Sequence, residues 1–231
     1  MTIGHDAAYQ PSTQDLRDIF FEEIVTRGGS IIDDSRYGDD RFTRATLPFE
    51  AEVAPKDTIS AGVALRGVRS EILVAPYTVR RVCTNGAIAT DILGEHRLVR
   101  LEASDAFLPL YEATVVLERF RERMRACVHT YVVEQIAAEM RRAASVDAST
   151  LWISVLSQLG DMPHRVLHRI HRAFLNGSDQ SLFGLMNAVT ATARTVDDPE
   201  VRWRLEAFGG TMPARAIHAP QTDPAASVAV E

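Results

Sequence analysis

The chain of 231 residues is 46% hydrophobic and 24% charged, a composition typical of a folded globular protein and not of a disordered one. This length indicates one domain, or one domain with an appended subdomain, and no stretch approaches the roughly 18 consecutive apolar residues of a membrane span. The formal net charge is -6, yet all but one of the 25 basic residues, Lys56, are arginine. The first residues lack the basic and apolar segments of a secretion signal, so we expect a cytoplasmic protein without membrane contact.

The two cysteines, Cys83 and Cys127, are too few for a disulfide framework or a four-cysteine zinc site, so we expect reduced thiols. Codon bias in a GC-rich genome would by itself produce an excess of arginine over lysine. The positions of the arginines are therefore more informative than their number. The acidic excess lies in residues 1–60, whereas residues 61–142 are mildly basic.

The first third of the chain predicts a tail, a helix and a loop. Residues 1–12 have no hydrophobic period and predict a flexible tail. Apolar residues between positions 16 and 25 follow helical spacing until Gly28, which predicts a helix that begins after Ser12. The acidic stretch 33–40 is interpreted as a loop.

Residues 41–101 change to an alternating pattern, which predicts short antiparallel strands, so 13–104 would form a helix plus an antiparallel sheet. Asn85 and Gly86 both tolerate the positive φ angles of a two-residue type I′ turn. We therefore expect the strand from Glu71 to Cys83 to reverse at these two residues.

Residues 105–215 are predicted to be helical and to pack on the sheet as one compact domain. Apolar residues at three- and four-residue steps predict one long amphipathic helix over 105–144, straight or kinked, about 60 Å in length. Part of it should pack on the carboxy-terminal helices or on another subunit. Shorter helices follow, the last of them ending just before Gly209 and Gly210, and a disordered tail is predicted at 216–231. The predicted fold is α+β: an N-terminal helix, a small antiparallel sheet, a long amphipathic helix and a C-terminal helical bundle.

One of the shorter helices carries His164, His168 and His171 on one face, a spacing that would let imidazole groups converge on a metal ion. The segment lacks the glutamate of a HExxH helix, and no carboxylate follows nearby. We therefore predict no metal site there.

Three arginine clusters are candidates for phosphate contacts. The candidate residues are Arg80 on the hairpin strand, Arg119 and Arg123 on the long helix, and Arg165, Arg169 and Arg172 on the histidine helix. Neighbouring Arg121 and Arg125 each follow a glutamate by three residues, which predicts internal ion pairs. An ordinary solvated helix face is the alternative interpretation of the histidine helix.

The sequence contains no nucleophile elbow, no phosphate-binding loop and no dinucleotide-binding glycine pattern. Lys56 lies in a polar loop, which argues against Schiff-base chemistry. We therefore expect a protein without catalytic residues and without a cofactor.

Two segments, APYTVRRVCTNGAIA (75–89) and SLFGLMNAVTATARTVDDPEVRWRLEAFGG (181–210), resemble motifs of domain-of-unknown-function family 932, whose members look like cargo of phages and plasmids. The resemblance assigns structural roles to six residues: Arg81, Cys83, Asn85 and Gly86 in the hairpin, and Asn187 and Thr190 on a helix. The last two would cap a loop or bridge to the sheet, or Asn187 would contact a ligand.

The order of sheet and long helix is also similar to that of single-strand annealing proteins, which hold DNA in an arginine-lined groove. If the six candidate arginines converged on one groove, single-stranded DNA would be the favoured partner. We therefore predict a non-catalytic, nucleic-acid-associated protein of a mobile element, acting in DNA replication, recombination or defence. Two alternatives stay open: a homo-oligomeric scaffold joined through the long helix, and a hydrolase that uses the histidine helix.

Overall fold

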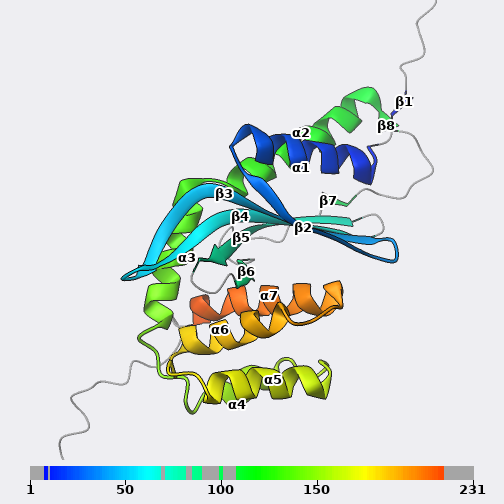
Figure 1. Cartoon of the computed structure of the whole chain (residues 1–231). Helices are drawn as coiled ribbons and strands as arrows, with labels where there is room; N and C mark the ends of the chain where they lie inside the picture. Colours follow the sequence, from blue (N-terminus) through cyan, green and yellow to red (C-terminus); the bar gives the residue numbers. More distant parts are fainter. Residues whose placement is uncertain are drawn as a thin grey trace, which may run out of the picture.

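A computed structural model of the protein describes residues 8–9, 11–68, 71–81, 85–89, 99–100 and 108–215 (Figure 1). It confirms the α+β fold. The strands are β1 (Ala8–Tyr9), β2 (Ser30–Tyr37), β3 (Asp40–Ala54), β4 (Asp57–Val68), β5 (Glu71–Arg80), β6 (Gly86–Ile88), β7 (Val99–Arg100) and β8 (Leu108–Pro109). The helices are α1 (Thr13–Thr26), α2 (Leu110–Cys127), α3 (Thr130–Ala143), α4 (Trp152–Ser157), α5 (His164–Leu175), α6 (Leu182–Ala193) and α7 (Pro199–Arg215).

The sheet is an antiparallel meander in the order β2-β3-β4-β5-β6, and β7 pairs with the other end of β5. Helices cover both faces, with α1 and α2 on one and α7 on the other (Figure 1). Side chains alternate accordingly. Ala45, Val63 and Val74 join the main core with α1 and α2, whereas Phe42 and Tyr77 pack with Trp203 of α7.

The sequence pattern indicates a loop over 33–40, but the structure has a β-hairpin there. Asp33 and Asp34 lie in β2, and only Gly38, with φ of 60°, and Asp39 form the turn. The carboxylates are tolerated in a strand because arginines pair with them. Arg17 of α1, for example, donates to Asp34 at 2.7 Å.

The end of the predicted amino-terminal tail contains regular structure. Ala8 and Tyr9 form the short strand β1, which pairs with β8. Ser12, the last residue of the predicted tail, caps α1 in a capping box with Asp15.

The predicted long helix is interrupted: it consists of two helices, α2 and α3, that separate at Val128 and His129. The His129 side chain accepts a hydrogen bond from the Tyr131 amide at 3.2 Å and so caps α3. α2 packs against α1 and β5, whereas α3 packs against β3, α6 and α7. The apolar stripe that suggested a subunit interface is thus buried largely within this chain, from Phe120 to Met140.

Gly86 and Gly210, which are predicted to form a turn and to follow the end of a helix, have other roles in the structure. Gly86 is not a turn residue but lies in β6, where an added Cβ would come within 1.8 Å of the Tyr77 hydroxyl oxygen. Gly210 does not follow the end of a helix, because α7 continues to Arg215. It lies against β6, where an added Cβ would be 2.0 Å from the Ile88 carbonyl oxygen. Both glycines permit close packing, one of a tyrosine ring on β6 and the other of α7 on β6.

Candidate functional site

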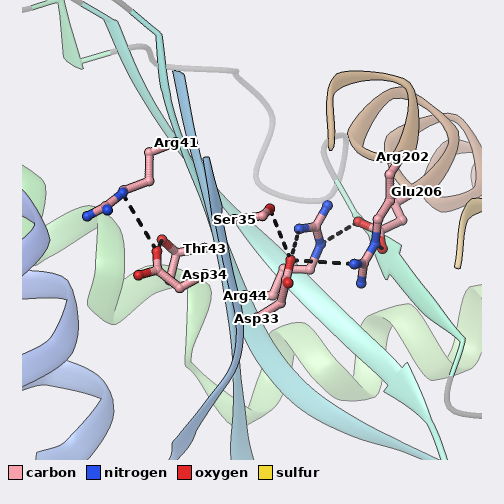
Figure 2. Close-up of polar contacts among 8 residues, drawn as sticks. All are labelled: Asp33, Asp34, Ser35, Arg41, Thr43, Arg44, Arg202 and Glu206. Carbon is pink, nitrogen blue, oxygen red and sulfur yellow. Dashed lines mark hydrogen bonds and ion pairs between the residues drawn. The ribbon is translucent and has the colours of Figure 1, made fainter. Parts of the chain in front are cut away.

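Four charged side chains, the ion cluster Asp33, Arg44, Arg202 and Glu206, join the sheet to α7 (Figure 2). Arg44 of β3 has no solvent exposure, and its Nε donates to Glu206 Oε2 at 2.6 Å. Its Nη1 donates to Asp33 Oδ2 on β2 at 2.5 Å. Arg202 lies 3.1 Å from Glu206 and 3.5 Å from Asp33. Two positive and two negative charges therefore balance in one network.

Burial dominates the electrostatics of the ion cluster. It raises the pKa of Glu206, and the guanidinium groups of Arg44 and Arg202 oppose that rise. Burial also raises the pKa of Tyr77, and the nearby Glu206 carboxylate adds to the effect. Removing Arg44 would leave a desolvated carboxylate with one partner fewer. The ion cluster thus holds α7 against β2 and β3.

Sequence reasoning missed the ion cluster, because Arg44 and Glu206 lie 162 residues apart. The only local signal is the i,i+4 spacing of Arg202 and Glu206 within α7.

The two segments that carry the family resemblance meet where β5 and β6 adjoin α6. Asn85 is buried, and its Nδ2 donates to the main-chain oxygen of Asn187 at 3.5 Å. The Thr190 hydroxyl donates to the Met186 carbonyl oxygen at 3.0 Å, within α6. The contact between helix and sheet is therefore made by the Asn85 side chain and the Asn187 backbone, whereas the Thr190 hydroxyl bonds within α6.

A small cavity lies at this junction, lined by residues that include Thr78, Arg80, Asn85 and Asn187. Its volume of about 10 Å³ gives room for about one water molecule. Sites for small organic ligands have volumes of roughly 300–1,000 Å³. The junction is therefore a packing feature of the structure and not a substrate pocket.

Arg80 is held beside this cavity by a carboxylate. Its Nε and Nη2 donate to Asp57 at 2.9 and 2.6 Å, and the guanidinium carbon lies 5.1 Å from the centre of the Phe183 ring. Arg81 is exposed and lies 3.3 Å from Glu50. Cys83 lies outside the described residues.

The arginines of α5 have a different environment. Val166, Ile170 and Phe174 bury one side of the helix. The opposite side exposes Arg165, Arg169 and Arg172 together with His164 and His168. We call these five residues the α5 basic face. Within the described part of the chain its arginines form no ion pair, although Arg169 donates to the Thr195 carbonyl oxygen at 3.4 Å. α4 and α5 form the layer farthest from the sheet (Figure 1).

Arg119 and Arg123 lie on α2, across the sheet from α5 (Figure 1). Arg119 is exposed, and Arg123 is half-buried. The predicted ion pair of Arg121 with Glu118 is present at 2.6 Å. The six candidate arginines therefore lie in three separate places and do not line one groove.

The third histidine of α5 is part of an aromatic pair. The His171 ring stacks on Trp152 of α4, with 4.4 Å between ring centres and 18° between planes. Among the described residues, no group of three histidine, cysteine or acidic side chains is placed to hold a metal ion.

Comparison of the chain with protein-family models, with curated proteins and with solved structures found no match. None of the helices in the described ranges has the length and hydropathy that crossing a bilayer requires.

Proposed function

We propose that the protein binds nucleic acid, without catalysis, by phosphate contacts along the α5 basic face. The observation that carries this proposal is the exposure of three arginines at i, i+4 and i+7 on the outermost helix. Among the described residues, no carboxylate forms an ion pair with any of the three. Guanidinium groups bind phosphate in bidentate geometry and stay charged at all physiological pH values.

The spacing of these arginines suits a phosphate backbone. Arg165 and Arg172 are seven residues apart, which is about 10 Å along a helix axis. One DNA strand in the B-form presents a phosphate about every 3.4 Å along the duplex axis, so this length matches about three phosphates.

The overall charge of -6 does not oppose this binding. Much of the acidic excess lies in α1 and the first strands, where Asp33 and Asp34 are paired with arginines. At 0.1 M salt, charges more than about 10 Å apart are largely screened. The field that a phosphate meets at α5 is therefore set by α5 itself and its near neighbours.

Salt dependence tests this proposal quantitatively. Neutralising three phosphates of a single strand gives a slope of about -2 for log K against log salt concentration, whereas six arginines in one groove would give about -4. We expect the shallower slope in fluorescence anisotropy titrations of a labelled oligonucleotide. The triple variant Arg165→Gln, Arg169→Gln and Arg172→Gln should lose binding and salt dependence together.

A charge-matched variant separates this local effect from net charge. Arg36, Arg125 and Arg142 are more than half exposed and lie on β2, α2 and α3. Changing these three to glutamine alters the net charge equally and should leave affinity within about twofold. Equal loss in both variants, or no binding at 50 mM salt, would refute the proposal.

A further inference from the structure

One flank of the α5 basic face is apolar and aromatic. Trp152 is half-buried against the main core, and its ring stacks on that of His171 with 18° between the planes. Ile153, the next residue of α4, is 64% exposed, and Leu175 at the end of α5 is 52% exposed. On α5, Leu175 follows His171 by four residues, so both lie on the same side of the helix.

The arginines lie beside this flank on the same helix. Arg172 is the neighbour of His171 in sequence, and His168 lies about one helical turn before His171. A ligand that contacts Arg172 therefore lies within one helical turn of Leu175 and of His171, on which the Trp152 ring stacks. We name Trp152, Ile153, His171 and Leu175 the aromatic flank.

We infer that the aromatic flank receives unpaired bases, so that the protein prefers single-stranded nucleic acid to duplex. This inference rests on the proposed function and specifies its ligand. In a duplex the base faces are stacked on each other, and only the backbone and the groove edges are offered to a protein. A single strand presents its base faces, and stacking on aromatic groups is the usual source of affinity for it. One strand could place its phosphates on the arginines and its bases on the aromatic flank.

The charge of the surface favours a nucleic acid strand over an anionic membrane. A membrane-surface helix presents its apolar face to the lipid and its cations around the edge. In α5 the apolar face is instead buried in the protein through Ile170 and Phe174, and the exposed apolar groups form only one flank. Vesicle binding is therefore the alternative that the experiment must address.

The test uses the full chain, a labelled dT oligonucleotide of about 15 nucleotides, and a blunt duplex of the same length. We expect tighter binding to the single strand. Trp152→Leu should weaken single-strand binding at least about fivefold and leave duplex binding within about twofold. Trp152→Phe, which keeps a ring for stacking, should restore most of the affinity. His171→Leu changes a side chain outside the core and should have the same selective effect, so the test does not depend on the folding of Trp152→Leu.

Each outcome has one meaning. Selective loss of single-strand binding in Trp152→Leu or His171→Leu, with rescue by Trp152→Phe, supports the inference. Equal affinity for strand and duplex, unchanged by these variants but lost in the α5 triple variant, overturns the inference and leaves the proposed function intact. Absence of any nucleic acid binding, with or without binding to vesicles of 30% phosphatidylserine, overturns both.

Discussion

Replacing Arg44 by methionine should be among the most destabilising single changes in this chain. The side chain is fully buried, and it is one of the two arginines that bind Glu206, itself fully buried. Breaking a buried ion pair by removing one partner typically costs about 3–5 kcal/mol, because the remaining charge stays desolvated. Since the free energy of unfolding of a domain is about 5–15 kcal/mol, we expect a large drop in the midpoint of urea unfolding measured by circular dichroism.

The double variant Arg44→Met, Glu206→Leu provides the decisive comparison. It removes one positive and one negative charge and leaves Asp33 and Arg202, 3.5 Å apart and each about a quarter exposed, as a remaining pair. We expect the double variant to be more stable than Arg44→Met alone, with a coupling free energy of about 1–3 kcal/mol. Arg66→Met is the matched control, because its ion pair with Glu200 is partly exposed, so its loss should cost less than about 1 kcal/mol. Additive effects, or a loss below 1 kcal/mol in Arg44→Met, would refute the argument from desolvation.

Two further predictions concern single side chains. Lys56 has a φ of 66° in the turn between β3 and β4, so Lys56→Gly should raise the free energy of unfolding by up to about 1 kcal/mol, and an equal gain from Lys56→Ala would contradict this explanation. Burial raises the pKa of Cys127 to about 12. In a Cys83→Ser variant the native protein should therefore resist iodoacetamide at pH 8 and react only in urea, as followed by mass spectrometry, because the thiolate is the reactive form. Rapid alkylation without urea would show that the thiol is accessible.

The elements that could be predicted from sequence are those with local causes. The spacing of apolar residues and the cap at Ser12 define α1, and the flanking proline and glycine define α5. The mistaken elements depend on residues distant in sequence. The acidic strand β2 is compatible with a sheet only because Arg44 and Arg17 reach its carboxylates. Likewise, the role of Gly210 depends on the backbone of β6.

The same distinction applies to the site. The arginine and histidine pattern of α5 is periodic within one helix, so its exposed face could be predicted from the sequence. The pairing of Arg80 with Asp57 depends on strand register, and the stacking of Trp152 on His171 depends on the path between two helices. No spacing rule predicts either contact. Position in the fold therefore decided which arginines stay available to a ligand.

The attachment of α7 has a consequence for the order in which this chain folds. One face of the sheet, including Phe42, Tyr77 and the buried Arg44, is completed only by Trp203 and Glu206 of the last described helix. At 5–20 residues per second, a ribosome needs roughly 6–24 s to synthesise the segment between β5 and α7. During that interval the nascent sheet has an uncovered apolar face, and Arg44 can pair with Asp33 of β2 but not yet with Glu206 of α7. Truncation or slow translation before α7 should therefore cause aggregation during synthesis. This effect should exceed any effect on the unfolding of the finished protein.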